Sequence, residues 1–156
     1  MTTLADLHRA VQSTLASKRL GRPVFVRYLF CGPDKADAAL PRLAQLTAAV
    51  RDWLGQPLER VHAAGTPRGG QVSLTLELRG GATALVSWAA APPRSDGIDL
   101  TVLGNRGALY HDAGAARLGG EAALGPAGTP DKALLALLER ALRSGRPETA
   151  DAGGSP

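Results

Sequence analysis

The clearest pattern in this chain is a strict alternation of apolar and polar positions from Gln71 to Arg79. Successive side chains of a strand point to opposite faces of the sheet, so the alternation predicts a half-buried strand. Gly80-Gly81 follows and predicts a hairpin turn, with positive φ available at both glycines. Residues 82–91 return with the same alternation and end at Pro92-Pro93. The outward positions of the two strands are Ser73, Thr75, Glu77, Arg79, Thr83, Leu85 and Ser87.

Further strands are predicted where short apolar runs lie between glycine, proline or polar turn residues. These segments are residues 23–30, 58–64, 98–103 and 108–111. The first is apolar at nearly every position, so we expect both of its faces to be covered over much of its length. The glycine and proline of Cys31-Gly32-Pro33-Asp34 are expected to end it.

Three segments carry apolar residues at the spacing of an amphipathic helix, namely residues 3–20, 37–54 and 129–144. Thr3 is expected to cap the first helix. Thr129-Pro130-Asp131 is expected to start the third with a capping hydroxyl, a proline and an acid. The glycines that follow the three segments are expected to end them, and they are Gly21, Gly55 and Gly145.

The order of these elements is helix, strand, helix, a run of strands and a final helix, which predicts an α+β fold. We expect a mostly antiparallel open β-sheet with helices packed on one face and the other face free for oligomerisation. Residues 1–147 are expected to form this single domain, with a loose connection over 112–128 that has room for a short strand near 116–118. The small and polar residues 148–156 are expected to form a disordered tail.

Composition narrows the class of protein. The 156 residues are 44% hydrophobic and 21% charged, as in an ordinary globular domain, and no apolar run approaches the ~18 residues of a membrane span. The lone Cys31 excludes an internal disulfide and fits a reducing cytoplasm, and the polar first residues argue against a signal peptide. The net charge of +4 comes from scattered arginines, which fit either phosphate recognition or a GC-rich coding sequence. We therefore expect a cytoplasmic protein with no membrane and no nucleic-acid partner.

Few residues are candidates for chemistry. No Gly-x-Gly-x-x-Gly lies between a predicted strand and a helix, so the sequence offers no dinucleotide cradle. His8, His62 and His111 fall on different elements, without further ligands at metal-binding spacing, so no metal site is expected. Arg27, Tyr28 and His111 are candidate residues for a cleft that binds a carbohydrate or an anion, although structural polar roles are the commoner explanation.

Three stretches, taken in order, resemble a known family. Residues 17–27 join a helix to the first strand, Trp53-Leu54-Gly55-Gln56-Pro57 ends a helix, and residues 104–110 connect two later strands. This order resembles the C-terminal sheet domain of the Gfo/Idh/MocA family of NAD(P)-dependent sugar and polyol oxidoreductases, over residues 4–147. In that family a Rossmann domain comes first and the exposed face of the sheet stacks subunits. Here only one helix precedes the first of these stretches, so we expect a chain without the cofactor domain.

The resemblance also bears on catalysis. Family members carry an Asp-x-x-x-His pair, beside the nicotinamide and the substrate, near the start of the helix that corresponds to residues 37–54. Counted back from the shared helix end, these positions are Pro41 and Gln45, and neither side chain can transfer a proton. The family's catalytic Lys belongs to the domain that is expected to be missing. The resemblance therefore implies no catalytic residue, no cofactor-binding residue and no cofactor in this chain.

Three functions remain open at this point. The first is a non-catalytic relative that acts as a binding or assembly module, as a homodimer or a larger even oligomer. Its sheet-face interface would be formed by Ser73, Thr75, Glu77, Thr83 and Leu85. The second is a subunit that completes an oxidoreductase in trans on a separate Rossmann-containing partner, with helix 3–20 at the junction. The third is an independent small-molecule enzyme or binding protein that uses the candidate cleft residues.

Overall fold

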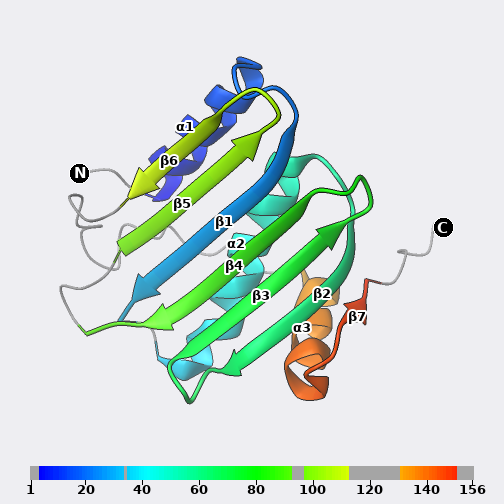
Figure 1. Ribbon diagram of the computed structural model, residues 1–156. Coiled ribbons are helices and arrows are strands. Elements are labelled where there is room, and N and C mark those ends of the chain that lie inside the picture. Colours follow the sequence, from blue (N-terminus) through cyan, green and yellow to red (C-terminus); the bar gives the residue numbers. More distant parts are fainter. Residues whose placement is uncertain (1–3, 34, 93–96, 113–130, 151–156) are drawn as a thin grey trace.

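The computed structural model describes residues 4–33, 35–92, 97–112 and 131–150, and the statements that follow concern these residues. They form a seven-stranded sheet with three α-helices on one face, so the fold is α+β with a mostly antiparallel open sheet, as predicted (Figure 1). The helices are α1 (Leu4–Ala16), α2 (Ala39–Leu54) and α3 (Lys132–Ser144), and a short 3-10 helix, η1 (Ala36–Ala38), precedes α2. The strands are β1 (Pro23–Gly32), β2 (Leu58–Thr66), β3 (Gln71–Leu78), β4 (Thr83–Ala90), β5 (Gly97–Gly104), β6 (Ala108–Asp112) and β7 (Glu148–Thr149).

The sheet is organised around a central parallel pair. Its strand order is β6-β5-β1-β4-β3-β2-β7, in which β1 pairs with β4 in parallel and every other neighbouring pair is antiparallel. α2 carries the chain from β1 across one face of the sheet to β2, and β3 and β4 then return strand by strand toward β1. A parallel pair needs such a crossover, because a hairpin joins only antiparallel strands.

The core lies between the helices and one face of the sheet. α2 packs on β1 and β4, whereas α3 packs on α2 and β2. Burying one large apolar side chain stabilises a fold by about 1.5–3 kcal/mol, so this layer is the main source of folding free energy. Its largest fully buried side chains include Tyr28, Phe30, Leu43, Leu46, Leu74, Leu76, Trp88, Leu100 and Leu138.

α1 is shorter than its apolar pattern predicts. The helix ends at Ala16, and residues 17–20 form a turn that leads to Gly21. The Ser17 hydroxyl donates to the Thr14 carbonyl (2.7 Å), and Lys18 adopts a positive φ of 57°. A right-handed helix cannot continue through a residue with a positive φ, so α1 ends before Lys18.

In the described part of the chain, no helix has both the length and the hydrophobicity needed to cross a membrane.

The start of α3 also differs from its prediction, whereas the ends of α2 and α3 agree. The Asp131 side chain accepts a hydrogen bond from the Ala133 N–H (2.9 Å), so Asp131 is the N-cap and α3 begins at Lys132. The expected caps Thr3 and Thr129 lie outside the described residues. The glycines expected to end α2 and α3 adopt the left-handed conformation, with φ of 63° at Gly55 and 60° at Gly145.

β1 differs from its prediction in length and in cover. It continues past Phe30 to Gly32, because Cys31 and Gly32 still pair with β4. Its helix side is buried, but no described element covers Phe25, Arg27 and Leu29 on the other side. The expectation that both faces of this strand are covered is therefore wrong.

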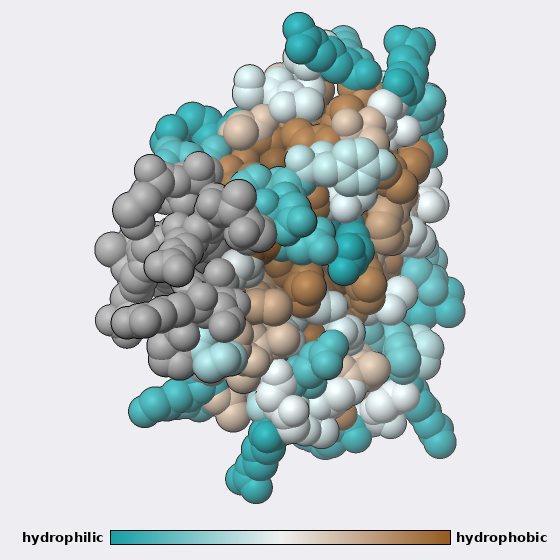
Figure 2. Space-filling view, turned by 60° about the vertical axis from the view of Figure 1, so that its left-hand side comes forward, coloured by the Kyte–Doolittle hydropathy of each residue, from teal (hydrophilic) through white to brown (hydrophobic). Residues whose placement is uncertain are grey.

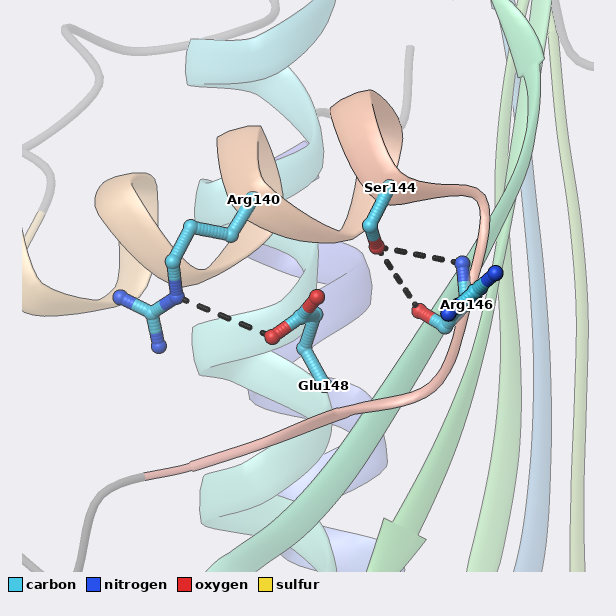
Figure 3. A network of polar contacts seen from close by, with 4 residues as sticks. All are labelled: Arg140, Ser144, Arg146 and Glu148. Atoms are coloured by element: carbon cyan, nitrogen blue, oxygen red, sulfur yellow. Dashed lines mark hydrogen bonds and ion pairs between the residues drawn. The ribbon is translucent and has the colours of Figure 1, made fainter.

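Glu148 and Thr149 form β7 beside β2, so the predicted disordered tail is wrong at these two positions. Backbone groups at a sheet edge gain hydrogen bonds when a strand is added, which favours this pairing. Figure 3 shows the segment between α3 and β7: the Ser144 hydroxyl accepts from the Arg146 N–H (3.1 Å), and Arg140 Nε lies 3.9 Å from Glu148 Oε2. Residues 151–156 and nearly all of the expected connection over 112–128 lie outside the described residues.

The turn between β5 and β6 is fastened to the connection between α1 and β1. Asn105 Oδ1 accepts from the Arg22 N–H (2.8 Å), and the Arg106 N–H donates to the Leu20 carbonyl (3.0 Å). Gly104 approaches Leu20 so closely that a β-carbon would overlap the Leu20 carbonyl oxygen. Two of the stretches that carry the family resemblance, 17–27 and 104–110, are therefore in direct contact.

This close approach leads to a test of stability. We expect Gly104→Ala to lower the free energy of unfolding by about 1–3 kcal/mol, because the added methyl group displaces the Leu20 backbone. Gly107→Ala in the same turn is the control, since its methyl group would have its nearest neighbour at 3.5 Å, an ordinary contact. Urea unfolding followed by circular dichroism measures both variants. Equal stabilities would contradict the close approach.

Candidate functional site

The face of the sheet that points away from the helices, here named the open face, is not covered by any described element (Figure 1). The strand registers align one residue from each of six strands in a central row across it. From β6 to β2 this row reads Tyr110, Thr101, Arg27, Leu85, Thr75 and His62. The middle of the face therefore carries a mixture of aromatic, hydroxyl-bearing, cationic and apolar side chains.

Apolar side chains are concentrated on the part of the open face formed by β6, β5, β1 and β4. Phe25, Leu29, Leu85 and Leu103 are half-buried there, and Tyr110 is 73% exposed. Figure 2 brings the β6 side of the molecule forward and shows hydrophobic residues reaching the surface between polar ones. An apolar patch of this kind on an uncovered sheet face is typical of an interaction surface.

Two ion pairs within the chain lie on the open face. Arg27 Nη1 lies 3.0 Å from Asp99 Oδ2, and Arg60 Nη2 lies 3.3 Å from Glu77 Oε2. All four side chains are 36–47% exposed, so each pair contributes only about 0–1 kcal/mol to stability. Their main effect is that the two charges of each pair neutralise each other on the open face.

The five residues predicted for the sheet face all lie on it. Ser73 Oγ is 2.8 Å from Ser87 Oγ of the neighbouring strand, Thr75 pairs with Leu85, and Glu77 pairs with Thr83. The sequence reasoning missed the contribution of β1, β5 and β6 to the same face. The alternation of exposure in those strands is visible only once their pairing is known, because both sets of positions in β1 are mostly apolar.

The three candidate cleft residues do not meet. Arg27 belongs to the open face, whereas Tyr28 and His111 point to the helix side, in a row separated by Leu100 of β5. Adjacent residues of a strand necessarily face opposite ways, so Arg27 and Tyr28 cannot line one cleft. The sheet thus separates Arg27, on the open face, from the rings of Tyr28 and His111 on the helix side.

Tyr28 belongs instead to an aromatic cluster between α1, β1 and α2. His8 Nε2 of α1 lies 2.9 Å from the Tyr28 hydroxyl, and the Trp53 ring of α2 lies 5.1 Å from His8 and 5.7 Å from Tyr28 between ring centres. Burial raises the pKa of Tyr28 above its ordinary range, against the opposing effect of Arg42, so its hydroxyl stays protonated. Burial also lowers the pKa of His8, which favours the neutral imidazole, and the tautomer of that ring sets the direction of its hydrogen bond with the Tyr28 hydroxyl.

This cluster predicts a pH dependence of stability. Because the pKa of His8 is lower in the folded protein than its ordinary value of 6.5, the unfolded chain binds a proton more readily. The free energy of unfolding should therefore be fully maintained above pH 6.5 and fall as the pH falls below 6.5 toward the folded pKa. Urea titrations at several pH values check this in the unmodified protein, in His8→Gln and in His62→Gln on the open face. The acid-side loss should shrink in His8→Gln and remain in His62→Gln; identical profiles for all three would contradict it.

The positions that the resemblance aligns with the family's Asp-x-x-x-His pair lie in the first half of α2. Pro41 offers no polar side-chain atom, and Gln45 Oε1 accepts a hydrogen bond from Arg42 Nη1 (2.7 Å). The Arg42 guanidinium in turn lies 5.0 Å from the centre of the Phe30 ring. Nowhere in the described residues do three His, Cys, Asp or Glu side chains converge as a metal site requires. The local chemistry is hydrogen bonding and cation–π contact.

No protein-family model matches the chain, and no curated protein sequence matches it. A myo-inositol dehydrogenase from Lactobacillus casei, solved with NAD(H) and myo-inositol, matches with a TM-score of 0.74 and 13% identity, over 96% of this chain and 60% of that chain. A putative myo-inositol dehydrogenase from Sinorhizobium meliloti 1021 matches at 0.67 and 18%, over 92% and 61%. A probable dehydrogenase from Thermotoga maritima matches at 0.55 and 15%, over 67% and 38%.

These matches show the fold. The chain has the fold of the sheet domain of Gfo/Idh/MocA-type inositol dehydrogenases, which confirms the resemblance at that level. The matched part is mainly the C-terminal region of the solved chains, and this chain spans 38–61% of the three. At identities of 13–18%, these matches establish a common architecture and do not identify a substrate for this chain.

Proposed function

We propose that this chain is a non-catalytic assembly module that binds a second copy of itself through the open face of its sheet. The observation that carries the proposal is the group of half-buried apolar side chains, with the exposed Tyr110, on a sheet face that no described element covers. An antiparallel sheet leaves such a face either in water or paired. Pairing with an identical face satisfies it without any other partner.

The polar residues of the face are compatible with stacking. The three lysines of the chain, Lys18, Lys35 and Lys132, all lie outside the strands, so the strands present no lysine on this face, a residue that commonly prevents contact between sheets. Its two described ion pairs, Arg27 with Asp99 and Arg60 with Glu77, are made within one chain. Covering these four residues therefore buries two neutral pairs, which costs less than burying four separate charges.

The non-catalytic part of the proposal rests on the residues of α2. Pro41 and Gln45 stand at the positions of the family's proton-transferring pair, and Gln45 is engaged by Arg42. The sequence holds no glycine-rich loop between a strand and a helix that would cradle a dinucleotide. The chain itself therefore supplies neither the proton transfer nor the cofactor site.

A second candidate is a subunit that completes an NAD(P)-dependent sugar or polyol oxidoreductase in trans with a Rossmann-containing partner. It is favoured by the match to a dehydrogenase that holds NAD(H), which includes 96% of this chain. α1 would then lie at the junction. Co-purification of a nucleotide-binding subunit in fixed proportion to this chain would support the second candidate, whereas a homodimer without such a subunit supports the first.

The oligomeric state tests the leading proposal. We expect light scattering at micromolar concentration to report twice the 16.1 kDa mass of the chain, since a stable interface of about 1,200–2,000 Å² fits one sheet face. Thr75→Arg places an unpaired cation in the central row and should yield the monomer, while its exposed position leaves the fold intact. Gln12→Arg on the exposed side of α1 is the control and should remain dimeric. A monomeric unmodified protein would overturn the stacking proposal.

Cofactor binding tests the non-catalytic part. We expect NAD(H) and NADP(H) to bind more weakly than about 100 µM, because no backbone cradle for the pyrophosphate exists in the sequence. Isothermal titration calorimetry on the purified chain measures this directly. A dissociation constant tighter than that limit would reveal a cofactor site of a different kind and remove the basis for calling the module non-catalytic.

A further inference from the structure

A cavity of about 410 Å³ lies away from the open face, between the end of α2, the first half of α3 and the start of β2. Its volume is within the range of small-ligand sites, which are mostly apolar with a few placed polar groups. Its lining residues are Arg51, Pro57, Leu58, Asp131, Ala133, Leu134, Leu137, Arg140 and Ala150.

The apolar part of the cavity is formed by leucines of the core. Leu58, Leu134 and Leu137 are only 4–9% exposed, because the rest of each side chain is packed in the core. Ala133 and Ala150 are small and leave the space in front of these leucines open. The buried leucines therefore form a hydrophobic surface at the base of the cavity, against which a small branched or linear apolar group can pack.

The charged groups of the cavity differ in how they are already engaged. Arg51, in the last turn of α2, makes no side-chain hydrogen bond or ion pair with any described residue. Asp131 uses one carboxylate oxygen, Oδ1, to cap α3 at the Ala133 N–H (2.9 Å). Arg140 is oriented by Glu148 through Nε, and Figure 3 shows its terminal nitrogens turned away from that carboxylate. A guanidinium and a carboxylate thus line one cavity without forming an ion pair between Arg51 and Asp131.

We propose that this cavity binds a free α-amino acid with an apolar side chain, of which leucine is the type. A guanidinium suits a carboxylate, to which it donates two parallel hydrogen bonds, and the capping carboxylate suits an ammonium group. The leucine floor accommodates the side chain. The lining carries two guanidiniums, those of Arg51 and Arg140, and the carboxylate of Asp131, so a ligand with both an anionic and a cationic group matches both signs of charge. The site is independent of the sheet-stacking proposal, because none of its lining residues lies on the open face.

The test uses the purified full chain and four probes in isothermal titration calorimetry. L-Leucine carries both charges and the apolar group, 4-methylpentanoate lacks the ammonium, L-leucinamide lacks the carboxylate, and glycine lacks the apolar side chain. We expect leucine to bind with a dissociation constant of about 1 mM or tighter, and each of the other three at least about tenfold more weakly. Equal binding of 4-methylpentanoate or leucinamide would overturn the assignment to an amino acid.

Two variants and a control locate the site. Arg51→Gln removes the cation, and Ala133→Phe fills the cavity from an exposed position without altering the core, so each should weaken leucine binding at least about tenfold. Arg143→Gln changes an exposed arginine of α3 outside the cavity and should bind leucine as the unmodified chain does. Thermal melts followed by circular dichroism confirm that the variants fold. Absence of leucine binding at about 10 mM, or binding unchanged in both cavity variants, would overturn the proposal.

Discussion

The packing of α2 against the central strands β1 and β4 is the contact on which the other features of this structure depend. α2 joins β1 to β2, and its position across one face of the sheet is what allows β4 to return beside β1 in parallel. Leu43, Leu46 and Val50 of α2 are completely buried in this contact. Because α3 and α1 pack against α2, they gather on the same side of the sheet. The covered core and the open face are thus two results of one interaction.

The two sides of β1 show how sharply the environments differ. Arg27 reaches solvent and pairs with Asp99, whereas the next residue, Tyr28, is fully buried against His8 and Trp53. Neighbouring residues of one strand therefore differ in role: Arg27 is accessible to a partner, whereas Tyr28 belongs to the core. The same division places the proposed assembly surface and the pH-sensitive aromatic cluster on opposite sides of one sheet.

The fold is shared with inositol dehydrogenases, but its local chemistry is this chain's own. At the positions that the resemblance aligns with the family's proton-transfer pair, α2 carries Pro41 and Gln45. Arg42 donates to Gln45 and lies over the Phe30 ring. Elsewhere the sheet edge is extended by β7, and the segment that forms it also places Ala150 at the cavity beside Arg51. The two proposed binding surfaces thus lie on a scaffold whose fold is shared with a dehydrogenase solved in complex with NAD(H) and myo-inositol.

Local sequence signals were sufficient wherever structure depends on neighbouring residues. The alternation over 71–79 placed Ser73, Thr75 and Glu77 on the correct face, and Gly55 and Gly145 ended their helices because glycine adopts positive φ without strain. The sheet-face candidates were therefore predictable, and so were the fold class and the apolar side of α2. These features follow from a two-residue or a 3.6-residue period and from single-residue conformational preference.

Tertiary structure alone decided which distant segments meet. The parallel pairing of β1 with β4, the contact of His8 with Tyr28 and the pairing of β7 with β2 join residues 20 or more positions apart. The mostly apolar pattern of β1 could not show which of its sides would be covered, since that depends on where α2 packs. A period in the sequence determines which residues share a face, but only the packing of the whole chain determines what that face contacts.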